Sequence, residues 1–187
     1  MTVIVGLVIP DKGVFLGGDS FGSDGFTGAA YVRPKVFKKD EFLIGVCGSY
    51  RLMQLLEFKL VIPDKTEKQS IDSYLYGDFV EAVRTCVKNG GALQADSGVE
   101  TLGRASFIFA FRGKLYEFQN DFSILEPKCG YTSTGSGIDH AQSSLYSTEN
   151  TELLPEERIK RAIQCANNFV ISVNDECTVL FQEYNNA

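Results

Sequence analysis

The chain has 187 residues, 44% of them hydrophobic and 22% charged, which is typical of a folded globular protein and excludes disordered and fibrous classes. This length fits one domain over residues 1–187, which would bury roughly 70% of the surface that its unfolded form exposes. The formal net charge is −6 without any basic block, so neither nucleic acid nor an anionic membrane surface is an expected partner.

The chain opens with a predicted β-hairpin. β-Branched and apolar residues fill 3–9 and 14–19, and Pro10 and Gly13 supply the turn between them. Glycines then crowd 17–25, which favours a loop that brings the backbone close to another group. A flexible surface turn is the alternative for this stretch.

A second hairpin is predicted over 32–38 and 42–47, with Lys35 in its first strand. Leucines at helical spacing then predict a helix over 50–58, with Ser49 as its N-cap. A second amphipathic pattern over 71–87 is followed by a glycine C-cap. These two helices are expected to pack together on one side of a sheet.

The rest of the chain again alternates strands with helices. The expected elements are a loop over 92–104, strands over 106–111, 115–119 and 122–125, helices over 136–145 and 154–170, and a last strand over 177–184. This order predicts an α+β fold, a four-layer αββα sandwich in which helix pairs cover two antiparallel sheets.

Chemistry is expected at the start of the first strand. A strand that begins at the second residue holds Thr2 in a rigid position, whereas most chain ends are loose. If Met1 is removed, Thr2 offers a hydroxyl nucleophile and an α-amine base on one residue, a pairing that needs no histidine. Without further support, Thr2 is only a small second residue.

The five cysteines are odd in number and form no C-x-x-C pair, which is poor material for a disulfide framework or a zinc site. We therefore expect no metal or other cofactor, and a reducing cytoplasm as the location. No positive segment precedes the short apolar run at the start, and no stretch reaches bilayer length, so neither secretion nor membrane spanning is expected.

Five motifs in order and register resemble the β-subunit of the proteasome and, more closely, the HslV-type peptidase, both N-terminal nucleophile hydrolases. They cover nearly the whole chain. The motifs are Thr2-Val3-Ile4-Val5-Gly6, Gly17-Gly18-Asp19-Ser20, Arg33-Pro34-Lys35-Val36-Phe37, Ile44-Gly45-Val46-Cys47-Gly48-Ser49, and Thr132-Ser133-Thr134-Gly135-Ser136-Gly137.

The resemblance implies a role for one residue of each motif. Thr2 would be the nucleophile, Asp19 the carboxylate beside it, and Lys35 the cation near its hydroxyl. Ser136 would be a polar partner of the terminal amine, and the backbone N–H of Gly48 an oxyanion donor. A free α-amine has an ordinary pKa of about 7.7–8.0, and a neighbouring lysine lowers that pKa further, so the amine can accept the hydroxyl proton near neutral pH.

Each of these residues also has a structural explanation. Asp19 at a strand end suits a turn cap, and Ser136 suits a helix N-cap. Lys35 suits a solvated strand position. In its catalytic role, Lys35→Ala is expected to remove activity at neutral pH without unfolding the strand, which needs only β-propensity there. His140, the only histidine, lies near Ser136, but the family uses no histidine and a triad is not expected.

In proteasome subunits an Asp, and a Ser three residues on, follow the fourth helix and help to hold the terminal amine. Alignment by eye puts Val170 and Val173 at those positions, and Asp175 and Thr178 have a similar spacing nearer the last strand. The HslV-type pattern also lacks the Asp.

The implied function is a threonine-type endopeptidase that degrades unfolded polypeptide inside a self-compartmentalising ring, with an AAA+ unfoldase as partner. The alternative is a catalytically silent proteasome-like subunit with a structural or assembly role, and a third hypothesis is a small-amide hydrolase of the same superfamily. Symmetric assembly is expected to use the helices at 52–60 and 80–87.

Overall fold

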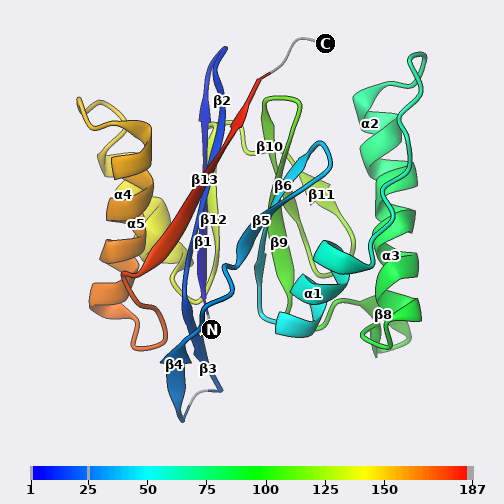
Figure 1. Cartoon of the computed structure of the whole chain (residues 1–187), viewed down its shortest axis with the longest axis horizontal. Helices are drawn as coiled ribbons and strands as arrows, with labels where there is room; N and C mark the ends of the chain where they lie inside the picture. The colour runs from blue at the N-terminus through cyan, green and yellow to red at the C-terminus, as the bar shows by residue number, and fades with distance from the viewer. Residues whose placement is uncertain (1, 25, 185–187) are drawn as a thin grey trace.

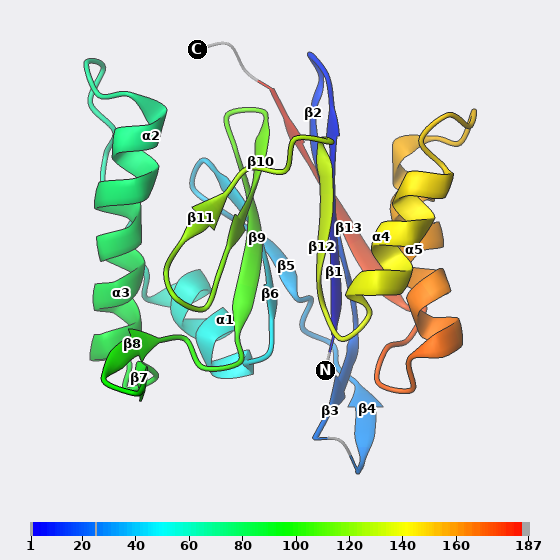
Figure 2. The ribbon, with the colours of Figure 1, turned by 180° about the vertical axis from the view of Figure 1, so that it is seen from behind.

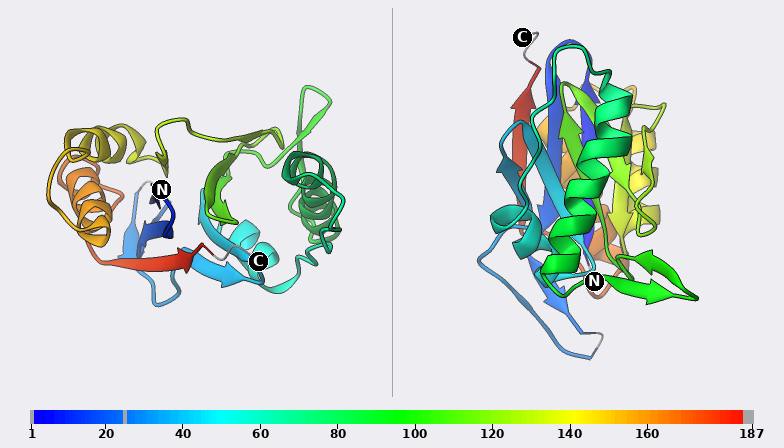
Figure 3. Two further views of the ribbon diagram at one scale, coloured as in Figure 1. Left: turned by 90° about the horizontal axis from the view of Figure 1, so that it is seen from above. Right: turned by 90° about the vertical axis from the view of Figure 1, so that its right-hand side faces the viewer.

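The computed structural model describes residues 2–24 and 26–184 and has four layers. Two β-sheets lie face to face in the middle, and helices cover the outer side of each sheet (Figure 1). The view from above shows the helices at the two outer edges and the strands between them (Figure 3). The predicted α+β fold and its αββα order are confirmed.

The first sheet is antiparallel and carries the start of the chain. Its strand order is β12 (Tyr131–Gly135), β1 (Val3–Ile9), β2 (Gly13–Asp19) and β13 (Cys177–Glu183). The helices α4 (Ile138–Ser147) and α5 (Pro155–Phe169) cover its outer face (Figure 2). Strand β1 is therefore a central strand, with β12 on one side and β2 on the other.

The second sheet is also antiparallel, with strand order β11 (Ile124–Leu125), β10 (Lys114–Phe118), β9 (Ser106–Phe111), β6 (Phe42–Cys47) and β5 (Val36–Lys39). Its outer helices are α1 (Tyr50–Phe58), α2 (Ile71–Ser73), a π-helical segment η1 (Tyr74–Phe79) and α3 (Val80–Asn89). Two small hairpins project from the sheets: β3 (Phe21–Ser23) with β4 (Gly28–Ala30), and β7 (Gln94–Asp96) with β8 (Val99–Thr101).

The core consists of three apolar layers, one at each interface of the sandwich. Ile4, Leu16 and Leu43 represent the cluster between the two sheets. A second cluster joins the first sheet to α4 and α5, and a third, rich in phenylalanine, joins the second sheet to the helices over it. Among the described residues, no helix is both long and apolar enough to cross a membrane.

The glycine-rich stretch 17–25 is not the loop that its composition predicted. Gly17 and Gly18 lie inside β2 and are buried. A Cβ on Gly17 would come within 2.3 Å of Ile159 on α5, and one on Gly18 within 2.8 Å of Ile4. Gly17 therefore allows the helix layer to approach the strand, and Gly18 makes room for a side chain of the adjacent strand β1. The expected close approach is correct although the loop is not. Residue 25 lies outside the described residues.

Three other predicted elements differ from the structure. The strand expected over 32–38 begins only at Val36, because Pro34 has no N–H to give to a ladder. The predicted loop 92–104 contains the hairpin of β7 and β8, and β12 was not predicted at all. The helix predicted over 71–87 is three consecutive segments, with a π-helical turn around Gly77.

Candidate active site

The register of the first sheet brings the candidate residues to one end of the sandwich. Val3 on β1 pairs with Gly135, the last residue of β12, and Ile4 pairs with Gly18 near the end of β2. Thr2 therefore meets the residues that follow both neighbouring strands. This end of β1 lies beside the β3–β4 hairpin, at the bottom of Figure 1.

A buried ion pair lies at the centre of the site. Lys35, which precedes β5, donates from Nζ to Oδ1 of Asp19 at 2.8 Å and also to the carbonyl oxygen of Phe21. Asp19 accepts from the backbone N–H of Val3 at 2.9 Å and from that of Phe21 at 3.1 Å. The side chains of Asp19 and Lys35 are 0% and 3% exposed, so the carboxylate is a buried junction of three segments and Lys35 is not a solvated strand residue.

Burial works against the charged forms of this pair. It raises the pKa of Asp19 above its ordinary value, although the Lys35 cation and the backbone N–H groups oppose the rise. Burial likewise lowers the pKa of Lys35, with Asp19 as the opposing charge. The expectation that Lys35 could be replaced without cost to the fold is therefore no longer tenable, because its loss leaves a buried carboxylate without its cation.

The nitrogen of Thr2 contacts the hydroxyl of Ser136, which in turn contacts the hydroxyl of Ser172. Its N–H donates to Oγ of Ser136 at 3.2 Å, and the Ser136 hydroxyl also lies 3.3 Å from the carbonyl oxygen of Thr2. Oγ of Ser172 lies 3.3 Å from Oγ of Ser136. Ser136 does not cap α4, whose N-cap Gly137 makes no side-chain hydrogen bond, so its hydroxyl serves Thr2.

Ser172 was missed by the sequence analysis, which placed the serine of the proteasome pattern at Val173. Ser172 is 2% exposed, whereas Val173 packs in the apolar core between the first sheet and its helices. The turn after α5 offers no periodicity from which to recognise a serine that reaches Ser136. The neighbouring Asn174 bonds to Ser20 instead.

Gly48 ends β6 with a backbone conformation suited to glycine. Its φ is +87°, and a Cβ there would lie 2.6 Å from the carbonyl oxygen of Arg104. Ser49 follows as the N-cap of α1, where its hydroxyl accepts from the N–H of Leu52 at 3.2 Å, as predicted. Gly48 is thus held between a strand end and a capped helix.

A small cavity of about 70 Å³ connects these groups. Thr2, Lys35 and Gly48 all contribute to its lining, as do residues of β3, β6 and the start of α1. The sequence-predicted nucleophile, cation and oxyanion donor therefore share one cavity, and Asp19 and Ser136 support it from behind through Lys35 and the Thr2 nitrogen.

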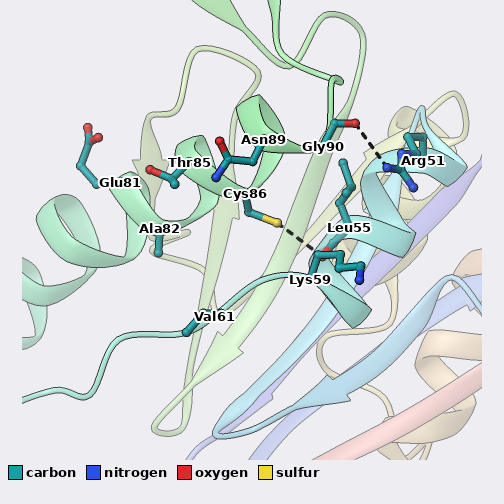
Figure 4. A pocket seen from close by; sticks show the side chains of 10 residues that line it. All are labelled: Arg51, Leu55, Lys59, Val61, Glu81, Ala82, Thr85, Cys86, Asn89 and Gly90. Carbon is teal, nitrogen blue, oxygen red and sulfur yellow. Dashed lines mark hydrogen bonds between the residues drawn. The ribbon is translucent and has the colours of Figure 1, made fainter.

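A larger hollow lies elsewhere. A groove of about 580 Å³ separates α1 from α3, and Arg51 spans one end of it by donating to the carbonyl oxygen of Gly90 at 3.3 Å (Figure 4). None of the residues that line the groove lines the cavity beside Thr2. His140 does not line that cavity either, and its ring stacks on that of Phe169 with the ring centroids 4.9 Å apart.

No cluster of three or more His, Cys, Asp or Glu side chains that could hold a metal ion is found in the described part of the chain. The five cysteines, all within that part, form no disulfide.

No family model matches the sequence, and no curated protein matches it significantly. Solved structures do match over almost the whole chain. BPH from Thiobacillus denitrificans in complex with epoxomicin aligns with a TM-score of 0.80 at 16% identity, over 98% of this chain and 100% of that one. HslV from Trypanosoma brucei aligns with a TM-score of 0.69 at 21% identity, over 97% and 99%.

The Anbu (Gly-1) mutant from Hyphomicrobium sp. strain MC1 aligns with a TM-score of 0.69 at 14% identity, over 98% of this chain and 82% of that one. Identities this low identify the fold alone. The chain has the fold of the HslV-like and proteasome-like N-terminal nucleophile hydrolases.

Proposed function

We propose that the protein is a threonine-type endopeptidase whose nucleophile is the hydroxyl of Thr2. The observation that carries this proposal is the position of the Thr2 nitrogen, 3.2 Å from Oγ of Ser136 and in the same cavity lining as Lys35 and Gly48. Removal of Met1 would turn this nitrogen into a free α-amine, which is the base that such a nucleophile requires.

The first step would be attack of the Thr2 hydroxyl oxygen on a peptide carbonyl carbon, while the α-amine accepts the hydroxyl proton, directly or through a water. The carbonyl π electrons move to the oxygen, and the N–H of Gly48 would stabilise that charge, a contribution of about 3 kcal/mol in comparable sites. Collapse of the intermediate breaks the C–N bond, and the departing amine takes the proton from the α-amine.

This leaves the acyl half of the substrate as an ester on Thr2. Water then attacks the ester carbonyl, again giving its proton to the α-amine, and the acid product leaves as the Thr2 hydroxyl is restored. The Lys35 cation would favour the unprotonated amine by charge repulsion, and Asp19 would keep Lys35 in place.

We further propose that the protein self-associates into a ring that encloses the site. Its substrate would be unfolded polypeptide. The helical side of the second sheet supports this assembly, because Phe58, Val61 and Tyr76 are more than half exposed there and Val61 lines the open groove. An AAA+ unfoldase partner rests on the family resemblance described above, and a cytoplasmic location rests on the cysteine pattern.

Intact mass and peptide hydrolysis test the catalytic proposal together. We expect loss of the mass of Met1 in wild-type protein, no hydrolysis by Thr2→Ala, and partial hydrolysis by Thr2→Ser, which lacks only the β-methyl that restricts χ1. Thr66→Ala, at an exposed position between α1 and α2, is the matched control and should behave as wild type. Epoxomicin, the ligand of the T. denitrificans protein, should inhibit wild type.

Unchanged turnover in Thr2→Ala would refute the nucleophile assignment. A retained Met1 together with no hydrolysis by wild type would favour the silent structural subunit. Light scattering at micromolar concentration tests the assembly separately, and a strictly monomeric protein would remove the enclosed compartment from the mechanism.

A further inference from the structure

We propose that the free edge of strand β13 is an interaction surface, and that its partner is the same strand of a second copy of this chain. The two strands would run antiparallel about a two-fold axis at Leu180. The four strands of each first sheet would then form one continuous sheet of eight. This contact is separate from the groove between α1 and α3, which lies over the second sheet.

Strand β13 lies at the edge of the first sheet. Within the part of the chain that the structure describes, it pairs with β2 and with no other strand. In Figure 1 it crosses in front of the other strands of its sheet. One side of its backbone is therefore available to a partner.

Two hydrogen bonds show which backbone groups face that free side. The N–H of Ser20 donates to the carbonyl oxygen of Glu176 at 2.9 Å, and the N–H of Tyr184 donates to that of Lys12 at 2.8 Å. Even-numbered residues of this segment therefore face β2. Because the direction of hydrogen bonding alternates along an antiparallel strand, the odd-numbered residues point their N–H and C=O groups away from β2. They are Cys177, Val179, Phe181 and Glu183.

These outward-facing groups require an extended backbone as their partner. Natural edge strands usually prevent such pairing with charged side chains, a proline or a bulge. From Cys177 to Gln182, β13 has no charged residue and no proline, and its register with β2 runs without a bulge. Its side chains there are only half-buried. The edge thus lacks the usual protection against pairing.

A two-fold axis at Leu180 brings the outward-facing residues of the two copies opposite one another. Val179 then lies opposite Phe181 of the second copy, and Cys177 lies opposite Glu183 of the second copy. Every outward N–H and C=O of one strand meets its counterpart on the other. The Val179–Phe181 pair combines a β-branched with an aromatic side chain, a favourable cross-strand pair worth about 0.2–1 kcal/mol.

The side chains of these pairs extend an existing apolar layer. Val179 packs against the cluster between the first sheet and its helices, and the ring centroid of Phe181 lies 4.5 Å from that of Phe15, which packs against the same cluster. Val179 and Phe181 are each only partly buried in one copy. Pairing would place the two residues of each copy against those of the other and bury them further.

Charge is complementary in this register. Glu183 of the second copy would arrive beside Cys177, close to Lys160 on α5. Burial raises the pKa of the Cys177 thiol, and the Lys160 cation opposes the rise, so the ammonium lies within electrostatic reach of this position. Lys160 is 55% exposed and pairs with Glu156 at 2.6 Å. Its ammonium has three donors, so it can also bind the incoming carboxylate.

Glu183→Cys tests the register, because Cys177 already occupies the opposite position. Opposite residues that exchange both hydrogen bonds have Cα atoms about 5.5 Å apart, within the range of about 4.4–6.8 Å that a disulfide requires. With oxidised glutathione, this variant should form a covalent dimer in which Cys177 is linked to position 183 of the other copy. Mass spectrometry maps the link, and reduction should remove it.

Glu152→Cys is the matched control, at an exposed position between α4 and α5, and should form no link to Cys177. A link between the two copies of position 183 would mean a different register and would overturn the proposal. So would a folded Glu183→Cys protein that gives no covalent dimer, with folding followed by circular dichroism.

Amide hydrogen exchange tests the contact in the wild-type protein. The N–H groups of Val179 and Phe181 depend on the second copy for protection, whereas that of Leu180 faces β2 and is an internal control. Dilution should accelerate exchange at Val179 and Phe181 and leave Leu180 slow. Glu183→Lys should do the same without dilution, because it places a second cation beside Lys160.

Two results of the exchange experiment would overturn the proposal. One is exchange at Val179 and Phe181 that neither dilution nor Glu183→Lys changes. The other is protection of these amides only after an unfolded protein is added, which would assign the edge to a polypeptide ligand and not to a second copy.

Discussion

Two of the protein's hollows have opposite characters. The groove between α1 and α3 is about eight times larger than the cavity beside Thr2, at about 580 Å³ against about 70 Å³. Apart from the buried Leu55 and Cys86, its lining comes from exposed or half-buried residues in or next to α1 and α3. Around the small cavity, by contrast, a carboxylate and a lysine ammonium are removed almost completely from water.

This difference shows why size is a poor guide to chemistry. Burying Asp19 and Lys35 costs free energy that a surface pair would not, and the hydrogen bonds of Asp19 to two backbone N–H groups compensate only part of that cost. A buried ion pair of this kind is therefore expected where it has a function. The residues that line the groove carry no comparable cost of burying charge. Its exposed apolar residues instead suit contact with another protein surface.

The largest expected effect comes from the ion pair. Lys35→Met should lower the free energy of unfolding by about 3–5 kcal/mol at pH 8 and abolish hydrolysis, because it leaves the Asp19 carboxylate buried without a cation. Urea denaturation measures the loss, and Lys38→Met, at an exposed position on β5, is the control.

The loss of stability in Lys35→Met should depend on pH in a definite direction. Without Lys35, the pKa of Asp19 in the folded protein rises still further above its unfolded value of 3.8. The folded state then binds the proton more tightly than the unfolded state, so the variant recovers stability as pH falls through the raised pKa. A loss that grows toward acid would contradict a buried, unpaired carboxylate.

A smaller effect on the rate is expected at Gly48. Gly48→Ala brings a Cβ within 2.6 Å of the carbonyl oxygen of Arg104 and forces the loop to move. Loss of an oxyanion donor should reduce kcat by about 10²–10³-fold. Gly91→Ala is the control for backbone strain, because Gly91 also has positive φ, at +68°, but open space around it. Equal rates in both variants would remove Gly48 from the mechanism.

The hydroxyls of Ser136 and Ser172 should contribute less to the rate. Ser172→Ala removes a hydroxyl 3.3 Å from Ser136 and should reduce kcat by about 10-fold, the factor that corresponds to about 1.4 kcal/mol. Ser136→Ala should cost more, because Ser136 itself contacts the Thr2 nitrogen. Kinetics of the double variant decide whether the two act together, since residues in one network give non-additive losses. Additive losses would mean that Ser172 acts independently.

The smallest effect on the free energy of unfolding is expected from a substitution in the groove between α1 and α3. Thr85→Arg places a long cation on an exposed position of α3 and should change the free energy of unfolding by less than about 0.5 kcal/mol. Under the proposed assembly it should nevertheless shift the species seen by light scattering toward smaller particles. Loss of folding in this variant would show that the groove belongs to the core and not to an interface.

The sequence predicts the strongly patterned elements well. The apolar β-branched run of β1, the aromatic run of β9 and the Ser49-capped helix α1 each carry a local signal that the tertiary structure does not override. The meeting of Thr2, Asp19 and Lys35 was predicted only through the family motifs, because local patterns do not reveal which strand ends come together.

The unpredicted parts lack such a signal for physical reasons. Strand β12 reads Tyr-Thr-Ser-Thr-Gly and appears polar, yet its buried hydroxyls have partners: Thr132 donates to Glu117, and Ser133 to the carbonyl oxygen of Ile138. In the sequence Lys35 resembles a solvated residue, because no local pattern shows that Asp19 lies beside it in the fold. Polar residues that are satisfied by distant partners resemble loop residues in a sequence.

The hydrogen bond between the Thr2 nitrogen and Ser136 spans 134 positions along the chain, and Ser172 lies further on still. During synthesis the candidate nucleophile therefore leaves the ribosome long before its partners. At about 5–20 residues per second, the delay between Thr2 and Ser172 is roughly 10 to 30 s. Under the proposed function the nascent chain would therefore be inert, and proteolysis would begin only when folding has joined the two ends of the molecule.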